Sequence, residues 1–173
     1  MPRSALIVID MLVDFIRKRG ALYCGPTAEK IVPFIKQKIE DARKADSIVI
    51  YLTDSHRQND KEFRMFPPHS VRGTPGAQII PELKPKRGDI IVRKTRFSGF
   101  YGTKLEEVFK NNKIKHVAIV GVCTSICVMD TVGDFRNRDY PVTVYKKGVA
   151  DFDQKSHRFA LKRMENIYGA EVV

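Results

Sequence analysis

The sequence predicts an α/β fold, as a single three-layer α/β/α domain with a doubly wound, mainly parallel sheet. Short apolar runs alternate with segments of helical periodicity along the whole chain. The runs are continuous and show no polar alternation, which is typical of parallel strands buried on both faces. No repeat or linker interrupts the 173 residues, so we expect residues 1–173 to form one domain.

The first part of the chain predicts a strand, a helix and a second strand. Residues 4–10 (SALIVID) and 47–53 (SIVIYLT) are the two apolar runs. Between them, apolar side chains recur at three- and four-residue steps over residues 27–45. This pattern predicts one amphipathic helix, with Pro33 in its early turns.

The middle of the chain predicts a long loop, a third strand and a helix. Residues 55–88 are rich in Pro, Gly and charge, and loops of this length are typically functional or disordered. The aromatic and histidine content favours a functional loop. Residues 89–94 (DIIVRK) form the expected strand, and residues 104–112 the helix.

The last part of the chain predicts three strands and two helices. A strand over residues 116–122 leads to a helix that begins near Cys127 and ends at about 138. A fifth strand is expected at residues 141–145 and a helix at 154–167, and residues 170–173 add an edge strand.

Four reactive side chains fall at the predicted carboxyl ends of strands. Asp10, Asp54, Lys94 and Cys127 each end a strand or lie just beyond one. In doubly wound sheets this edge carries the ligand site, where the strand order reverses. We therefore expect the four side chains to meet there.

Cys127 is the candidate nucleophile in this group. At the start of a helix, unpaired N–H groups and the helix dipole lower the pKa of a thiol and offer donors to an oxyanion. Lys94 would hold the thiolate and the neighbouring carboxylates in their charged forms. Each residue also has an ordinary interpretation: a buried cysteine, a snorkelling lysine and, for Asp10, a turn cap.

A second group of side chains predicts a metal site in the long loop. Asp54 and His56, with His69 thirteen residues after His56, offer one carboxylate and two imidazoles, which are ligands that suit zinc, iron or manganese. Glu62 is a further candidate ligand. By spacing alone this signal is weak.

Composition narrows the classes of protein. Three cysteines, an odd number, argue against a disulfide framework and for a reducing, cytoplasmic compartment. No apolar run is long enough to cross a membrane, and no signal-peptide pattern is present. The net charge is +11, but Lys and Arg are dispersed among acidic residues, so we expect a solvated basic surface and no nucleic-acid partner.

Five motifs resemble the isochorismatase-like cysteine hydrolase superfamily and, within it, the nicotinamidases and pyrazinamidases. The resemblance spans nearly the whole chain. The motifs are VIDMLVDF (residues 8–15), the Asp54-Ser-His56 step, FPPHSVRGTPGA (66–77), KTRFSGFYGTKL (94–105) and GVCTSICV (121–128).

This resemblance implies a catalytic triad and an oxyanion hole. Asp10 would be the general base, Lys94 the stabilising cation and Cys127 the nucleophile. The backbone N–H groups of Cys123 and Cys127 would bind the oxyanion, next to a cis peptide between Val122 and Cys123.

The resemblance also implies a metal site and a substrate. Asp54, His56 and His69 would hold a divalent metal, with zinc expected and iron or manganese as alternatives, and Glu62 would be a fourth, variable ligand. Phe15 and Phe66 would contact the substrate. The expected reaction converts nicotinamide to nicotinic acid and ammonia through a thioester, a step of NAD salvage.

Departures from the family pattern keep alternatives open. Ser125 and Ser70 replace residues that are often Asp and Cys in relatives, and the insertion after His56 is short and basic. The main alternative is an amidase for a small N-carbamoyl or ureido compound that needs no metal. A remote one is a basic binding protein on this scaffold. Relatives form homodimers or tetramers, so a homo-oligomer remains an open expectation.

Overall fold

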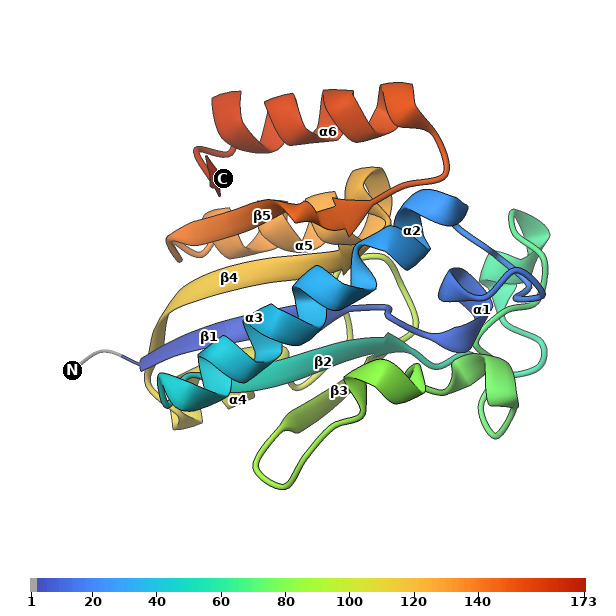
Figure 1. Cartoon of the computed structure of the whole chain (residues 1–173), viewed down its shortest axis with the longest axis horizontal. Coiled ribbons are helices and arrows are strands. Elements are labelled where there is room, and N and C mark those ends of the chain that lie inside the picture. Colours follow the sequence, from blue (N-terminus) through green and yellow to red (C-terminus); the bar gives the residue numbers. More distant parts are fainter. Residues whose placement is uncertain (1–2) are drawn as a thin grey trace.

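The computed structural model describes residues 3–173, and its centre is one six-stranded sheet (Figure 1). The strands are β1 (Arg3–Ile9), β2 (Ile48–Asp54), β3 (Ile90–Lys94), β4 (Ile114–Val122), β5 (Val142–Ala150) and β6 (Glu171–Val172). They lie in the order β3-β2-β1-β4-β5-β6, and every neighbouring pair is parallel. The predicted doubly wound parallel sheet is confirmed, with the strand order reversing between β1 and β4.

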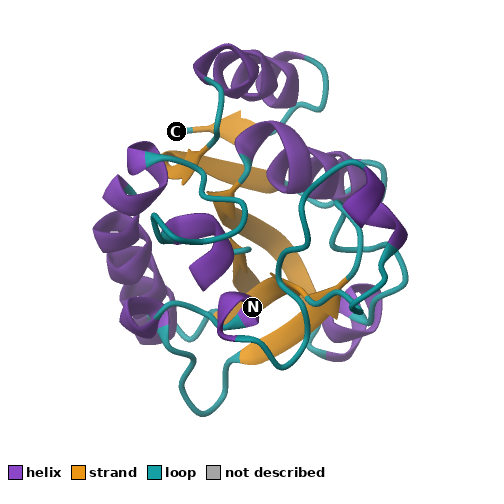
Figure 2. Cartoon of the chain, turned by 90° about the vertical axis from the view of Figure 1, so that its right-hand side faces the viewer, coloured by secondary structure: helices purple, strands orange, loops and turns teal. Residues whose placement is uncertain are grey.

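Helices cover both faces of this sheet, which gives three layers (Figures 1 and 2). One face carries α1 (Val13–Ile16), α2 (Pro26–Lys30) and α3 (Val32–Lys44), which share one apolar cluster with the sheet. The other face carries α4 (Leu105–Asn111), α5 (Met129–Arg136) and α6 (Gln154–Asn166), which share a second cluster.

The continuous apolar strands follow from this double covering. In β1, Leu6 and Val8 pack into the cluster beneath α3, whereas Ile7 and Ile9 pack into the cluster beneath α5 and α6. Each of the four is at most 3% exposed. Because neither face meets water, no polar alternation is needed.

The single helix predicted over residues 27–45 is wrong in one respect. The structure divides it into α2 and α3, with Ile31 between them. Pro33 lies in the first turn of α3, as expected. A proline lacks the N–H that a continuous helix would need at that position, and its ring clashes with the preceding turn, so the helix restarts there.

Strand ends differ from prediction most clearly in β5. The prediction ended this strand at residue 145, but it continues to Ala150. Lys146 and Lys147 are exposed and break the apolar pattern, while Val149 and Ala150 beyond them are buried against the sheet. β4 also begins earlier than predicted, at Ile114.

The long segment 55–88 begins at the carboxyl end of the sheet and returns to its amino end, where residues 86–90 lie beside Arg3 and Ser47. It contains three short 3-10 turns, η1 (Lys61–Arg64), η2 (Pro75–Ala77) and η3 (Pro81–Leu83). Isolated backbone bridges join His56 to Val71 and Leu12 to Ile79. These bridges hold the segment against the ends of β1 and β2.

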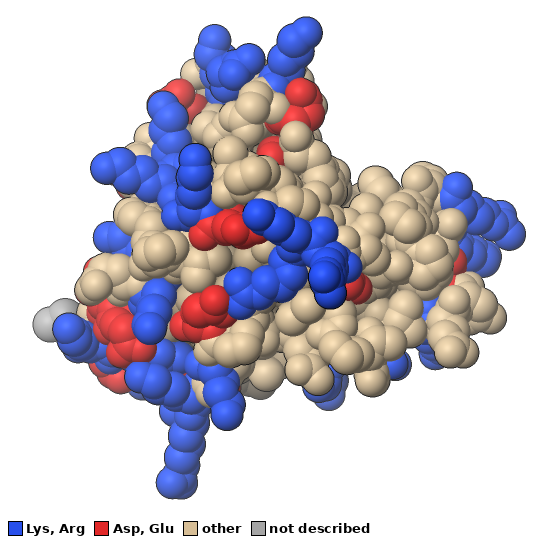
Figure 3. All heavy atoms as spheres, turned by 45° about the vertical axis from the view of Figure 1, so that its right-hand side comes forward, with Lys and Arg blue, Asp and Glu red and all other residues tan. Residues whose placement is uncertain are grey.

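The surface is basic but not segregated. On the face seen in Figure 3, Lys and Arg side chains lie over much of the surface, with Asp and Glu between them. One such pair is Lys110 with Glu106, 2.7 Å apart on α4. Within residues 3–173, no helix is both long and apolar enough to cross a membrane.

Candidate active site

The carboxyl ends of four adjacent strands bring the predicted reactive residues together. Asp10 follows β1, Asp54 ends β2, and Lys94 ends β3 directly beside it in the register. Cys127 follows β4, which lies on the other side of β1. The four side chains are 1–7% exposed, so the site is a buried one.

Lys94 is the centre of this group. Its Nζ lies 2.7 Å from Oδ2 of Asp10, 2.5 Å from Oδ1 of Asp54 and 3.4 Å from Sγ of Cys127. Reactive atoms of Asp10, Asp54 and Cys127 all lie within 4.8 Å of one another. The structure thus gathers a thiol, a carboxylate and a cation; their catalytic roles stay predictions.

Asp10 is held in place by its own backbone. Its φ of 50° turns the chain sharply at the end of β1, in a region that Asp tolerates better than most residues. Its Oδ1 accepts the N–H of Asp54 at 2.8 Å. That bond occupies one carboxylate oxygen and leaves Oδ2 facing Lys94.

The charges of the group are strongly coupled. Burial and the nearby Asp54 carboxylate raise the pKa of Asp10 to about 6, although Lys94 opposes them. Burial also opposes ionisation of Asp54, but Lys94, His56 and His69 outweigh it and hold the pKa of Asp54 well below its usual range. Burial disfavours the Lys94 ammonium, yet Asp10 and Asp54 raise its pKa well above the ordinary value. The group therefore favours a charged Lys94 and an ionised Asp54, whereas Asp10 holds a proton more readily than an ordinary carboxyl group.

The expected lowering of the Cys127 pKa is wrong for this structure. Burial raises the pKa of the thiol well above its ordinary value, and Asp10 and Asp54 add to the shift, while Lys94 opposes it. The helix-start argument did not include how deeply the sulfur is buried. The raised pKa favours the neutral thiol, which a base must deprotonate before the sulfur can act as a nucleophile.

The turn that carries Cys127 is wider than an α-helical first turn. Residues Thr124–Val128 form a π-helical turn that leads into α5, and the N–H of Val128 donates to the carbonyl of Cys123. Such turns occur frequently at functional sites. The cis peptide expected between Val122 and Cys123 is present.

Four side chains of the predicted metal site form one buried cluster. Asp54, His56, Glu62 and His69 are each at most 4% exposed. Nε2 of His56 lies 3.6 Å from Oδ2 of Asp54 and 3.9 Å from Oε1 of Glu62. Nε2 of His69 lies 3.7 Å from each of the same two oxygens.

These residues fit a divalent metal. Ligand atoms around a tetrahedral zinc with bonds of about 2.1 Å are about 3.4 Å apart, close to the separations found here. Burial and the Asp54 charge raise the pKa of Glu62, while His56, His69 and Lys94 oppose the shift. Within residues 3–173, Nε2 of His56 and Oε2 of Glu62 are buried without a hydrogen-bond partner.

Two further contacts orient the imidazoles toward the cluster. Nδ1 of His56 lies 3.1 Å from Oδ2 of Asp60, and Nδ1 of His69 lies 2.8 Å from the carbonyl of Pro67. Metal-binding histidines are typically fixed in this way, with the other ring nitrogen free for the ion. Asp60 was not predicted, because its role depends on a contact across a loop.

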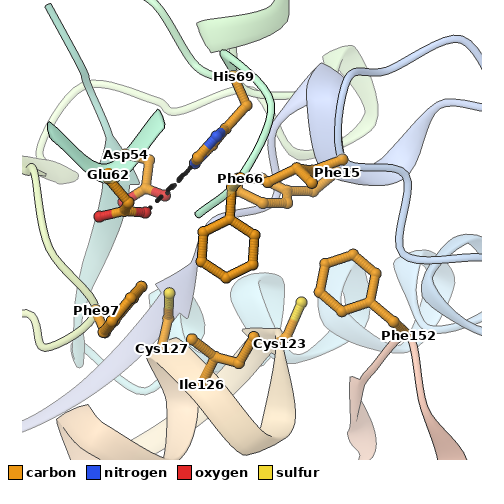
Figure 4. Close-up of a pocket in the computed structure, with 11 residues that line it drawn as sticks. Phe15, Asp54, Glu62, Phe66, His69, Phe97, Cys123, Ile126, Cys127 and Phe152 are labelled. Carbon is orange, nitrogen blue, oxygen red and sulfur yellow. Dashed lines mark ion pairs between the residues drawn. The ribbon is translucent and has the colours of Figure 1, made fainter. Parts of the chain in front are cut away.

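An apolar pocket adjoins both the thiol and the metal cluster (Figure 4). It has about 310 Å³ of empty volume. Phe15 and Phe66 line it, as expected of substrate-contacting residues, and both rings pack edge-on against His69. The other lining residues are Leu22, Asp54, Glu62, His69, Phe97, Cys123, Ile126, Cys127 and Phe152.

Some of the residues that shape the site carry no signal in the sequence. Phe97 and Phe152 line the pocket from two different loops. The Asp14 carboxylate accepts the N–H of Ser70 at 2.7 Å and that of Ala21 at 3.2 Å, so it ties the segment after His69 to the loop after α1. The VIDMLVDF motif contains Asp14, but only the structure shows what it binds.

Comparison with known proteins identifies the family of the chain. The family model for the isochorismatase domain matches residues 4–173. The solved nicotinamidase/pyrazinamidase PncA from Bacillus subtilis is 33% identical, with a TM-score of 0.94 over 99% of both chains.

Two other solved structures show the range of relatives. The pyrazinamidase of Pyrococcus horikoshii in complex with zinc is 30% identical, with a TM-score of 0.93 over 99% of both chains. The N-carbamoylsarcosine amidase from Thermoplasma acidophilum is 35% identical, with a TM-score of 0.89 over 98% of this chain and 95% of that one.

Proposed function

Because the chain belongs to the isochorismatase family, and because its site joins a thiol to a base and a cation, we propose that it is a cysteine amidohydrolase that converts nicotinamide to nicotinic acid and ammonia. One observation carries the proposal. The apolar pocket has the Cys127 thiol on one side and the metal-type cluster on another (Figure 4). In such a pocket the carboxamide of a planar ring amide would lie next to Cys127, and its ring nitrogen would lie next to the metal-type cluster.

The first step is attack on the amide carbonyl by Cys127. Asp10 takes the thiol proton, while Lys94 stabilises the thiolate that forms 3.4 Å away. The backbone N–H groups of Cys123 and Cys127 bind the oxyanion of the tetrahedral intermediate. Each such donor is typically worth about 3 kcal/mol of barrier.

The second step releases ammonia and then the acid. Asp10 returns its proton to the amide nitrogen, so ammonia leaves and a thioester to Cys127 remains. A water molecule, deprotonated by Asp10, attacks the thioester and restores the thiol. The balance is one amide and one water in, one carboxylic acid and one ammonia out.

Asp54, His56, Glu62 and His69 are the residues that would hold a divalent metal, and we propose zinc. When bound, it would supply a Lewis acid that holds the ring nitrogen and so orients the substrate. The zinc complex of the Pyrococcus horikoshii relative supports this assignment. Within the chain itself, the two imidazoles already present Nε2 to the cluster.

The lining of the pocket favours a neutral ring amide. Four phenylalanines contribute to it, and among the described residues that line it none is Lys or Arg. An N-carbamoyl amino acid or ureido acid brings a carboxylate, whose burial is costly without a cation. Lys94 is already paired with two carboxylates.

The likeness to an N-carbamoylsarcosine amidase keeps a second candidate, an amidase for N-carbamoyl compounds. It would use the same triad but would not need the metal-type cluster.

Ammonia release separates the two candidates. We expect zinc-loaded protein to release ammonia from nicotinamide, to lose this activity with a chelator, and to regain it with zinc. N-carbamoylsarcosine is the competing substrate, and Cys127→Ala is the control for a contaminating amidase. Turnover of N-carbamoylsarcosine alone, with no effect of the chelator, would overturn the proposal in favour of the second candidate.

A further inference from the structure

Phe152 is a pocket residue that neither the triad nor the metal cluster uses. It lies in the short connection between β5 and α6 and lines the pocket, yet 43% of it is exposed. Figure 4 shows its ring beside Cys123, across the pocket from Asp54, Glu62 and His69. The ring thus covers a part of the pocket that the metal-type cluster does not line.

One hydrogen bond from this connection and one from the first turns of α6 reach the turn that carries Cys127. Asp151, only 2% exposed, accepts the N–H of Ser125 at 2.6 Å. On the other side of Phe152, Nδ1 of His157 lies 2.9 Å from Oγ1 of Thr124. The chain on both sides of Phe152 is therefore fixed relative to the turn that carries Cys127.

The Phe152 ring is also free to receive another ring. Phe15 and Phe66 already pack edge-on against His69, and Phe66 packs against Phe97 as well. Within residues 3–173, Phe152 has no aromatic partner. A half-exposed phenylalanine at a pocket wall is well suited to contact a planar ligand.

We propose that Phe152 contacts the ring of the substrate and forms the outer wall of the pocket, so that it favours ring amides over aliphatic ones. This inference rests on the proposed nicotinamidase function. It adds a residue from the β5–α6 connection to the aromatic residues of the N-terminal half. Asp151 and His157 act as positioning residues, since they hold this wall against the nucleophile turn.

A tryptophan at position 152 tests the contact without catalysis. The chain contains six tyrosines but no tryptophan, so Phe152→Trp introduces a single tryptophan at the wall, which can be excited selectively at wavelengths that tyrosine does not absorb. We expect its emission to change when nicotinamide is added to the zinc-loaded double variant with Cys127→Ala, and to remain constant with acetamide, which has no ring.

Phe159→Trp is the matched control. Phe159 is 60% exposed on α6 and does not line the pocket. Its emission should not respond to nicotinamide. Calorimetry on the Cys127→Ala protein measures binding independently of either fluorophore.

Kinetics supply a second readout if the tryptophan disturbs folding. Phe152→Ala should raise KM for nicotinamide by roughly three- to tenfold, the size of one aromatic contact, with a smaller change in kcat. Phe159→Ala should leave both constants within about twofold of the unmodified protein, because it removes no pocket contact.

The outcomes separate this inference from the proposed function. The role of Phe152 is overturned if the emission of Phe152→Trp does not change while calorimetry shows nicotinamide binding. It is also overturned if KM is unchanged in Phe152→Ala. In either case, hydrolysis by the unmodified protein still supports the proposed nicotinamidase activity. Binding with a fluorescence response of Phe152→Trp but no hydrolysis by the unmodified protein would support the wall and overturn the proposed function. Absence of both binding and hydrolysis would overturn both.

Discussion

Replacing Lys94 with methionine should destabilise the fold as well as abolish activity. The ammonium is fully buried between Asp10 and Asp54, at 2.7 and 2.5 Å. Methionine fills a similar volume but leaves two carboxylates in the interior without a cation. Breaking a buried pair in this way typically costs about 3–5 kcal/mol. For a domain of this size, that loss lowers Tm by roughly 6–20 °C.

The loss in the free energy of unfolding caused by Lys94→Met should depend on pH. Without the cation, we expect Asp10 and Asp54 to hold protons in the folded state, with pKa values above those of the unfolded chain. A group of this kind contributes stability at low pH and loses it as pH rises. The difference in the free energy of unfolding between wild type and variant should therefore be larger at about pH 8 than at about pH 5.

Urea denaturation of chelator-treated protein, followed by circular dichroism at both pH values, measures this difference. Lys110→Met is the matched control, because Lys110 also pairs with a carboxylate, 2.7 Å away, but on the surface. Surface pairs contribute little to stability. If Lys94→Met cost no more than Lys110→Met at the higher pH, Lys94 would not be the counter-ion of a buried site.

Three further predictions concern the base and the metal. Burial and Asp54 raise the pKa of Asp10 to about 6, and only the ionised carboxylate accepts the thiol proton. The kcat/KM for nicotinamide should therefore fall as the pH decreases through that value. If the residual activity of Asp10→Asn fell at low pH in the same way, Asp10 would not be the base. Glu62→Gln should weaken zinc binding by at least about 10-fold, the loss typical even of residues that only support a ligand, in a competition with a chromophoric chelator. Glu82→Gln, at an exposed salt bridge with Arg17, should not weaken it. Free zinc at about 100 times its Kd should stabilise the protein by about 2.7 kcal/mol, a rise in Tm of roughly 5–11 °C, and no rise would argue against a folded-state site.

The sequence predicted the parts of the site that depend on strand topology. In a parallel sheet the carboxyl ends of the strands meet at one edge, so Asp10, Asp54 and Lys94 had to lie near one another once the strands were recognised. Residue types alone gave a weak metal signal for His69 and Glu62, the motif resemblance strengthened it, and the structure brings both side chains beside Asp54.

Features of the site that depend on how deeply a side chain is buried, or on contacts within loops, were not predicted. The direction of the Cys127 pKa shift follows from complete burial, which a helix-start pattern does not report. The π-helical turn at Thr124–Val128 leaves no periodic signal in five residues. Asp60 contacts His56, four residues before it in an irregular loop with no periodic pattern, and Phe152 lines a pocket with side chains far away in the sequence. Only the folded chain therefore shows where these two residues act.

The proposed mechanism requires that Cys127 carry the acyl group of the substrate as a thioester during turnover. Intact-mass spectrometry of zinc-loaded protein, quenched with acid during turnover of nicotinamide, tests it most directly. We expect a mass increase of one nicotinoyl group that is absent in Cys127→Ala, and fragmentation of the peptide that contains both Cys123 and Cys127 should place it on Cys127. An adduct on Cys24 or Cys123 instead, or nicotinamide turnover that persists in Cys127→Ala, would contradict it.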